Sequence, residues 1–225
     1  MTRKILIFEV LLTAAALAAT VFVYPHLPVS IPIHWDIHDR ADGFGPAWML
    51  FLTGPGFMAA TMLLTWLLPW LSPKNFQVDA FRATYRQVML MLFSLAAYLC
   101  IVMIWSAFGH AVNEGRAITG GVCLLIALLG NLMGKVRRNF FIGVRTPWTL
   151  ANERVWHATH RFAGKTLVAG GLVGLALLIF GLESFPIYAI LAGALAPVVY
   201  SLVYYKQLEH RGDLNGHTSQ GSAAK

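Results

Sequence analysis

Long runs of apolar residues alternate with short polar segments along the whole chain. Each run approaches the roughly 20 residues that an α-helix needs to cross a bilayer. The pattern therefore predicts an all-α polytopic membrane protein, built as a bundle of about six transmembrane helices. The expected spans are Ile5–Val23, Ala47–Leu71, Val88–Phe108, Ala117–Gly134, Thr166–Gly181 and Phe185–Tyr205.

Proline and glycine modify this simple pattern at three places. The second run contains Thr-Gly-Pro-Gly at 53–56, which predicts a bend or an irregular turn there. Pro197 predicts a kink in the sixth span, because proline lacks the backbone donor and crowds the preceding turn. The short sequence Leu-Glu-Ser-Phe-Pro at 182–186 predicts that the last two spans form a tight helical hairpin.

Composition agrees with a membrane protein. Hydrophobic residues make up 57% of the chain and charged residues only 12%, whereas soluble domains carry about 25% charged residues. No segment is long enough to separate two domains, so we expect a single integral-membrane domain over residues 1–210. The polar, Gly/Ser-rich tail 211–225 is expected to be disordered.

The distribution of basic residues predicts the orientation. Of the 17 Lys and Arg residues, all but Arg40 and Arg116 lie at the N-terminus, in the second and fourth loops, or in the tail. By the positive-inside rule these segments are cytoplasmic, so both termini face inward. The net charge of +7 therefore belongs to one face of a multi-pass protein of the cytoplasmic membrane, and it does not indicate nucleic-acid binding. The lipid bilayer is the partner that this face predicts.

Small residues inside the spans predict close helix packing. Cys100 and Cys123 are too far apart for a metal motif and are expected to be buried thiols. Glycines four residues apart let helix backbones approach closely, within the bundle or, alternatively, at a homodimer face. These glycines are Gly130, Gly134, Gly170 and Gly174.

The first external loop carries the densest polar chemistry outside the membrane. His34, Asp36 and His38 alternate with Trp35 and Ile37, so an extended strand would place the two imidazoles and the carboxylate on one side. Such a set could ligate zinc. The alternative is a compact cap without metal, and we predict no cofactor. Further candidates in this loop are His26, Asp39 and Asp42.

The fourth loop is the most polar internal segment. Thr146-Pro147 predicts a helix start, with Thr149 or Asn152 as later capping residues. From there to Lys165 the sequence is amphipathic, which predicts a cytoplasmic amphipathic helix that continues into the fifth span. Such a helix can anchor the chain at the lipid interface, or it can form part of a rigid platform for a partner.

The platform hypothesis gives specific roles to side chains. Arg145 would make a bidentate contact with a carboxylate such as Glu153, a task that suits the planar guanidinium. Trp148 and Trp156 would seat the helix at the interface. His160 would hydrogen-bond a neighbouring loop or the end of the second or third span.

The inner segment resembles the C-terminal signature of the SdpI-type membrane immunity proteins, over the region 117–205. The external loop, within residues 1–71, is similar to the short N-terminal domain that accompanies this signature; there Pro32, His34, Asp42 and Gly43 match, while Asp39 stands where a Gly is expected. The matching inner residues are Asn139, Gly143, Arg145, Thr146, Pro147, Trp148, Thr149, Trp156, His160, Gly164 and Lys165.

The resemblance implies a bacterial inner-membrane protein that confers resistance to a secreted, membrane-active toxin peptide. It also implies sensing of that peptide and signalling to a cytoplasmic transcriptional repressor. The outer loop would meet the peptide through His34, Trp35, Asp36, His38 and Asp42. The inner segment would bind the partner through Asn139, Arg145, Thr146, Pro147, Trp148, Thr149, Trp156, His160 and Arg161.

Two other classes of function stay open. A small transporter would use Glu9, an acid inside the first span, although snorkelling to the nearby cytoplasmic surface is an alternative explanation of this residue. A metal-dependent membrane enzyme would need the outer His/Asp loop, or His157 and His160, but the topology places these groups on opposite sides. The chain contains none of the common hydrolase, metalloprotease or phosphate-binding motifs, so we predict that it is not an enzyme.

Overall fold

The computed structural model describes residues 3–38, 40–107 and 112–215. Within these ranges six helices are long and apolar enough to cross a membrane, which confirms the all-α polytopic fold. The helices are α1 (Arg3–Val23), α2 (Met49–Phe51), α3 (Phe57–Leu71), α4 (Arg82–Ala107), α5 (Glu114–Met133), α6 (Pro147–Ala151), α7 (Glu153–Ile179) and α8 (Pro186–His210). Short turns are η1 (Tyr24–His26), η2 (Leu52–Gly56), η3 (Lys74–Phe76), η4 (Val78–Phe81) and η5 (Asp213–Asn215).

The second span is irregular where the sequence predicts it. It runs through α2, the π-helical turn η2 and α3, with Pro55 inside η2. A proline cannot supply its backbone hydrogen bond, and a widened turn accommodates the missing donor. By contrast, α8 continues as one helix through Pro197.

The fifth span departs most from its predicted length. From Glu153 onward, the amphipathic segment and the apolar run form one continuous helix, α7, of 27 residues. The predicted start at Thr166 marks only the point where the sequence becomes apolar, because helical hydrogen bonding continues across the change in polarity. The third span likewise begins earlier than predicted, at Arg82.

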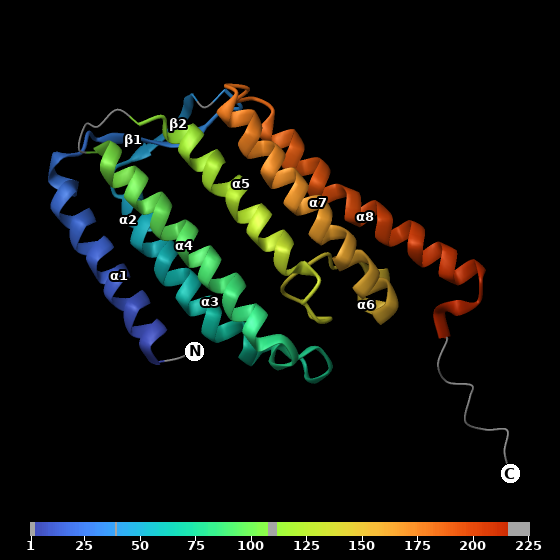
Figure 1. Cartoon of the computed structure of the whole chain (residues 1–225). Coiled ribbons are helices and arrows are strands. Elements are labelled where there is room, and N and C mark those ends of the chain that lie inside the picture. The colour runs from blue at the N-terminus through green and yellow to red at the C-terminus, as the bar shows by residue number, and fades with distance from the viewer. Residues whose placement is uncertain (1–2, 39, 108–111, 216–225) are drawn as a thin grey trace, which may run out of the picture.

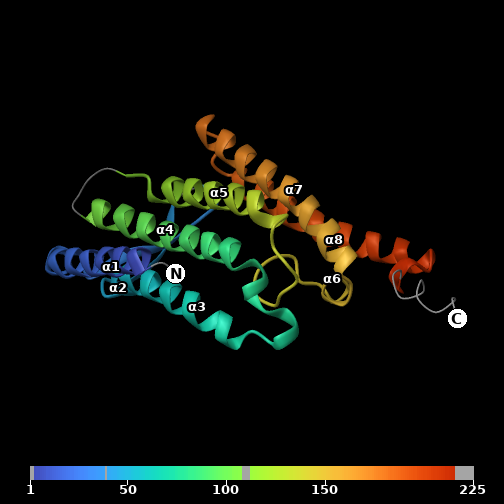
Figure 2. The ribbon, with the colours of Figure 1, turned by 60° about the horizontal axis from the view of Figure 1, so that its bottom comes forward.

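The bundle consists of two groups of helices (Figures 1 and 2). α1, α3 and α4 lie together on one side, and α5, α7 and α8 on the other, with α4 and α5 in contact between them. Close backbone approach holds the second group together. A Cβ on Gly170 of α7 would lie 2.7 Å from the carbonyl oxygen of Ala189, and one on Gly193 of α8 would lie 2.6 Å from that of Thr166. The small residues at these two positions therefore serve packing within the bundle.

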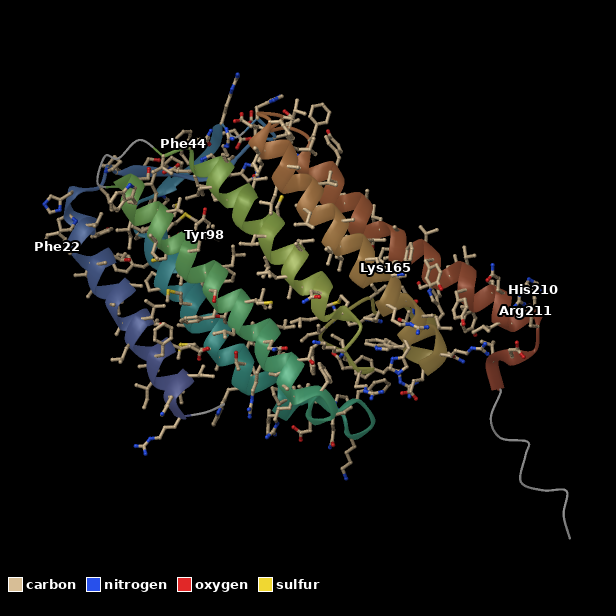
Figure 3. All side chains as sticks on the ribbon, in the orientation of Figure 1. Phe22, Phe44, Tyr98, Lys165, His210 and Arg211 are labelled. Atoms are coloured by element: carbon tan, nitrogen blue, oxygen red, sulfur yellow. The ribbon has the colours of Figure 1, made fainter. Side chains whose placement is uncertain are left out.

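The two ends of the bundle differ in chemistry. α1 begins at the same end as the loops after α3 and α5 and the end of α8 (Figure 1), as an inward-facing pair of termini requires. Lys165, His210 and Arg211 lie toward this cytoplasmic end, and Phe22 and Phe44 lie toward the opposite one (Figure 3). Large apolar side chains along α1 and α8 are exposed, for example Leu11 and Val199, and these faces are the ones that meet lipid.

The outer end carries a small antiparallel hairpin of β1 (Ser30–Trp35) and β2 (Ala41–Pro46). Ile31 pairs with Gly45 and His34 with Gly43, and the register shifts on both sides of His34. Ile31 packs with Ala47 and Leu50 in a small apolar cluster. The hairpin is therefore attached to the bundle by its buried face.

The largest buried cluster sits at the cytoplasmic end, where it supports the fourth loop. It joins η4, α4, α5 and α7. Its buried members are Val78, Phe81, Tyr85, Met89, Met133, Val136, Trp156 and Ala163.

Some predictions fall partly or wholly outside the described residues. Asp39, the end of the third span at Phe108 and residues 216–225 of the tail are among these. For the start of the tail the expected disorder is wrong, because Asp213–Asn215 form the turn η5. The carbonyl oxygen of Leu214 accepts a hydrogen bond from Asn152 Nδ2 at 3.1 Å, which fixes this turn against the start of α7. Cys100 and Cys123 are buried free thiols, as predicted.

Candidate functional site: the cytoplasmic platform

We call the loop 134–146, α6 and residues 153–163 of α7 the cytoplasmic platform. Asn139 organises its loop from the inside. Its side chain is fully buried and donates to the carbonyl oxygens of Arg137 (2.8 Å) and Ile142 (3.1 Å). Its Oδ1 accepts the N–H groups of Phe141 (2.7 Å) and Ile142 (2.8 Å). One amide thus supplies the backbone partners that a loop without regular structure otherwise lacks.

Gly143 and His160 connect this loop to α7. Gly143 has a φ of +109°, a conformation that favours glycine, and a Cβ at this position would overlap the imidazole of His160. The next residue, Val144, donates its N–H to His160 Nε2 at 3.1 Å. His160 Nδ1 lies 2.8 Å from the carbonyl oxygen of Trp156. One ring nitrogen accepts and the other donates, so these bonds require the neutral imidazole.

This geometry confirms the prediction that His160 bonds a neighbouring loop. The imidazole is almost completely buried, with 1% of its residue surface exposed. It stacks on the Trp156 ring at a centroid separation of 3.9 Å.

Trp156 does not contact lipid, so its predicted role of seating the helix at the lipid interface is wrong. The residue is fully buried in the cluster at the cytoplasmic end. Its indole Nε1 donates to the carbonyl oxygen of Val136 at 2.9 Å. The stripe that contains Trp156 and His160 faces the bundle because α7 packs against α5 there, so the apolar face meets protein and not lipid.

Thr146 and Thr149 cap α6 reciprocally. Thr149 N donates to Thr146 Oγ1 (3.3 Å), and Thr146 N donates to Thr149 Oγ1 (2.9 Å), which is a capping box in which a Thr replaces the usual Glu or Gln. Pro147 occupies the first helical position, as predicted. Thr149 is fully buried, and its hydroxyl lies 2.9 Å from the carbonyl oxygen of Val144.

Trp148 attaches α6 to the last span. Its indole Nε1 donates to Ser201 Oγ of α8, and its ring is only partly exposed. Ser201 is fully buried. Trp148 is therefore a contact between two helices, which is a different role from the predicted seat in the lipid interface.

The amphipathic stretch is not one helix from Pro147 onward. It breaks at Asn152, whose backbone is extended and whose Oδ1 accepts the Val155 N–H at 3.1 Å. Asn152 is thus the second of the predicted capping residues, and it starts α7.

Arg145 lies on the exposed surface of the platform. Its Nη1 donates to the carbonyl oxygen of Phe140, and the described residues show no ion pair between Arg145 and a carboxylate. The predicted bidentate contact is therefore wrong in its partner, because the loop folds back and presents a main-chain oxygen to the guanidinium. Glu153, the suggested partner, instead lies 3.4 Å from His157 Nε2.

The neighbouring cytoplasmic loop packs against the platform. Phe76 lies 4.3 Å from Phe140 between ring centroids, and the Arg138 guanidinium sits 5.3 Å from the Phe76 ring. Arg138 Nη1 also donates to the carbonyl oxygen of Leu150 at 3.1 Å. The second and fourth loops therefore form one cytoplasmic surface.

The predicted site residues separate into two groups. Asn139, Thr149, Trp156 and His160 are buried and bind the protein's own backbone. The predicted Arg145 and Arg161 are exposed cations on the surface of this framework, together with Arg137 and Arg154, which were not predicted as site residues.

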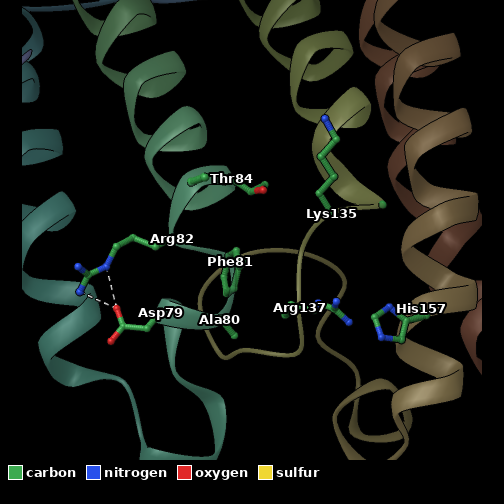
Figure 4. A pocket seen from close by; sticks show the side chains of 10 residues that line it. Asp79, Ala80, Phe81, Arg82, Thr84, Lys135, Arg137 and His157 are labelled. Carbon is green, nitrogen blue, oxygen red and sulfur yellow. Dashed lines mark hydrogen bonds and ion pairs between the residues drawn. The ribbon is translucent and has the colours of Figure 1, made fainter. Parts of the chain in front are cut away.

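An open cavity of about 670 Å³ adjoins the platform, between the start of α4, the end of α5 and the start of α7 (Figure 4). Arg82 on one side pairs with Asp79, with Nη2 and Oδ1 2.7 Å apart. On the other side Arg137 and His157 lie toward one another, while the side chain of Lys135 runs along α5.

On the outer face the predicted His34, Asp36 and His38 set does not assemble. His34 Nδ1 lies 2.6 Å from Asp42 Oδ1, whereas Asp36 Oδ1 accepts the N–H groups of His38 (2.8 Å) and Arg40 (2.9 Å). His38 Nδ1 lies 2.8 Å from the Ser184 hydroxyl in the turn between α7 and α8. The strand ends at Trp35 because the Asp36 side chain forms a local turn.

The pKa of Asp36 is consistent with a carboxylate that accepts backbone hydrogen bonds in this turn. The backbone hydrogen bond from Arg40, with a further one from His38, holds the pKa of Asp36 below its ordinary value, although partial desolvation opposes them. The described residues contain no group of three or more His, Cys, Asp or Glu that could hold a metal ion. Trp35 is half-buried in the hairpin.

Glu9 is buried inside the first span, with 4% of its surface exposed. Its side chain does not snorkel to the surface, and Oε2 has no hydrogen-bond partner among the described residues. A cavity of about 120 Å³ between α1, α3 and α4 is lined by Glu9, Thr65, Arg86 and Gln87, among others.

The partners of the platform residues are not evident from the sequence. Ser201 and Phe76 contact the platform from other segments, and Val136 contributes a carbonyl oxygen. A single serine within an apolar span was a usable signal, because polar side chains in spans commonly bond between helices. A main-chain acceptor such as that of Val136 leaves no such signal.

Comparison with known proteins matches both polar regions. The SdpI/YfhL protein family matches residues 135–205, and the Domain of unknown function (DUF1648) matches residues 11–59. A protein of Bacillus subtilis (strain 168) named "Immunity protein SdpI" is 29% identical over 205 residues, covering 90% of this chain and 96% of the relative. No solved structure matches. These matches confirm the resemblance to the SdpI family that the inner signature indicates, and the chain is a multi-pass protein of the bacterial cytoplasmic membrane.

Proposed function

We propose that this chain is a membrane immunity protein that protects its cell against a secreted, membrane-active toxin peptide. The observation that carries the proposal is the similarity to a relative named as an immunity protein, which extends over nearly the full length of both chains. The similarity includes the outer hairpin as well as the inner platform.

The outer hairpin is the proposed contact surface for the peptide. His34, His38 and Ile37 are exposed there, as are Val29 and Phe44. A surface that combines apolar side chains with a His–Asp pair suits an amphipathic peptide, since it offers both burial and hydrogen bonding.

The platform is the proposed contact surface for a cytoplasmic partner. Its buried framework holds Arg145 and Arg161 in place on the exposed face. Guanidinium groups bind carboxylates in a fixed geometry, so a repressor with an acidic surface is the partner that this face fits. Binding of the peptide outside would then alter the affinity of the platform for the repressor.

Expression in a sensitive bacterial host tests the immunity proposal. Cells that carry the wild-type chain should survive a membrane-active peptide at concentrations that kill cells with an empty vector. Survival should fall to the vector level when expression is not induced. If a broad panel of such peptides kills both strains equally while the protein is present in the membrane, the immunity function is rejected.

Transcript measurements in the natural host test the signalling proposal separately. Replacing Arg145 and Arg161 together by Gln should abolish the transcriptional response to the peptide while survival on challenge stays near wild type. A preserved response would show that these cations are not the partner surface.

A second candidate function is cation- or proton-coupled transport, and the buried carboxylate of Glu9 is the observation that favours it. An unpaired carboxylate within a span is costly and marks functional positions in transporters. Purified protein in vesicles should then carry protons or cations across the membrane, and Glu9→Gln should abolish this flux. Equal flux in vesicles with wild type, with Glu9→Gln and without protein would reject transport.

A further inference from the structure

The cavity beside the platform has the composition of an anion site. Among its lining residues Arg82, Lys135 and Arg137 are cationic, and Asp79 is the carboxylate. Asp79 is already engaged by Arg82 at 2.7 Å, so its charge is compensated locally. Lys135 and Arg137 have no ion pair with a carboxylate among the described residues, and they leave the cavity with an excess of positive charge.

The residues come from three separate elements, which gives the cavity a defined shape. Arg82 and Thr84 belong to the first turn of α4, Lys135 and Arg137 follow the end of α5, and His157 lies on α7 (Figure 4). The backbone of Arg137 is fixed, because its carbonyl oxygen accepts from the buried Asn139 side chain at 2.8 Å. The basic groups therefore do not depend on one flexible loop.

The Thr84 hydroxyl in this cavity indicates a ligand. Thr84 is 8% exposed, it lines the cavity, and its hydroxyl is directed from α4 toward α5 (Figure 4). Within the described part of the chain, no hydrogen bond satisfies this hydroxyl. Because the hydroxyl opens into the cavity and lies in the first turn of a 26-residue helix, it can donate to an oxyanion that the positive end of the helix also attracts.

We propose that this cavity binds a phosphate group. Arg137 and His157 contact the phosphate oxygens from the side of the loop and α7, and Lys135 adds charge from the end of α5. Thr84 donates its hydroxyl from α4. The ligand is either the headgroup of an anionic phospholipid of the cytoplasmic leaflet or a soluble phosphate from the cytoplasm.

Binding measurements on the full-length protein in a neutral detergent test the proposal. The probes are phosphatidylglycerol, glycerol 3-phosphate and inorganic phosphate, and the readouts are binding by native mass spectrometry and the rise in Tm. We expect saturable binding to the wild type with at least one of the probes. Saturation by phosphatidylglycerol alone identifies a lipid headgroup, and saturation by glycerol 3-phosphate or inorganic phosphate identifies a soluble ligand.

Three variants separate a site from general surface charge. Arg137→Gln should weaken binding about tenfold or more, and Thr84→Val, which keeps the shape and the net charge, should weaken it about five- to tenfold. Arg154→Gln is the matched control, because Arg154 is exposed on α7 and does not line the cavity; its affinity should equal that of the wild type.

Two outcomes would overturn the site. The first is an equal loss of affinity in Arg137→Gln and Arg154→Gln with no change in Thr84→Val, since this pattern reflects only the charge of the face. The second is the absence of saturable binding with all three probes. The Tm of each variant without ligand shows whether that variant is folded. If Arg137→Gln is not folded, the affinity of Thr84→Val decides whether the cavity is a binding site.

Discussion

The cytoplasmic platform and the outer hairpin use polar side chains in opposite ways. In the platform Asn139, Thr149 and His160 are buried, and each bonds to main-chain groups of the loop or of α7. In the hairpin the His34–Asp42 pair is exposed, with 71% and 47% of the two side-chain surfaces accessible. Histidine is therefore part of a buried framework in the platform, as His160, and an exposed side chain in the hairpin, as His34.

The difference follows from the surroundings of the two regions. The backbone N–H and C=O groups of a loop that enters the bundle need hydrogen-bond partners other than water. Specific side chains at fixed positions supply these partners. The inner residues that match the family signature are accordingly framework, with exposed cations on its surface. The hairpin has fewer such constraints, so its exposed residues are free to contact a ligand.

The largest expected effect would come from removing the centre of the platform. Trp156→Ala leaves a cavity in the buried cluster and orphans the Val136 carbonyl oxygen, and should cost about 3–5 kcal/mol. Membrane abundance should fall strongly and the Tm in detergent should drop. Trp70→Ala is the control, because Trp70 is 80% exposed and should have little effect. Normal abundance of Trp156→Ala would contradict the description of the platform as a folding element.

A slightly smaller loss is expected for Gly143→Ala. The positive φ alone should cost about 1–3 kcal/mol, and the new methyl group would displace His160 from Val144. Gly134→Ala provides the comparison, since an added Cβ there meets nothing within 4 Å. Thermal denaturation of the two proteins measures the difference, and equal Tm values would refute the close contact between Gly143 and His160.

Thr149→Val tests the hydrogen bonds of the Thr149 hydroxyl separately from the packing of the side chain. The substitution keeps the volume but leaves the Thr146 N–H and the Val144 carbonyl oxygen without their partner, which should cost about 1–3 kcal/mol. Thr65→Val is the matched substitution, because the Thr65 hydroxyl donates only to its own helix, to the Thr61 carbonyl oxygen. Thr149→Val should have the lower Tm, and the reverse order would show that the Thr149 hydroxyl does not hold the loop.

Arg145→Lys should have the smallest effect on stability within the platform. The Arg145 side chain is exposed and donates to a single carbonyl oxygen, so the cost should be under about 1 kcal/mol and abundance should match the wild type. Quantitative immunoblots of membrane fractions check this. A large loss of abundance would indicate that Arg145 contacts a carboxylate, as the sequence suggested.

The sequence predicts the spans and their orientation because both follow from local composition. Runs of apolar residues and the position of Lys and Arg need no knowledge of tertiary contacts, and the irregular turn at Pro55 follows from the chemistry of one residue. The inward-facing role of His160 also follows, since a polar residue in an amphipathic stripe seeks a partner. These predictions depend on short-range information alone.

The wrong predictions concern side chains whose surroundings are determined by tertiary contacts. Whether Trp156 faces lipid or protein depends on α5, which packs against α7. The partner of Arg145 depends on how the loop folds back at Phe140. His38 lies beside Ser184, which is 146 residues away along the chain, and no periodicity in the outer loop can indicate such a contact.

The most direct test compares protection per membrane-inserted molecule in the two regions. Trp156→Ala and the double variant His34→Ala, Asp42→Ala are expressed in the sensitive host, and survival on peptide challenge is divided by membrane abundance. The exposed pair is worth at most about 1 kcal/mol, so the double variant should keep its abundance and lose protection. Trp156→Ala should lose abundance while each remaining molecule still protects. Full protection by the double variant, together with normal abundance of an inactive Trp156→Ala protein, would contradict the account.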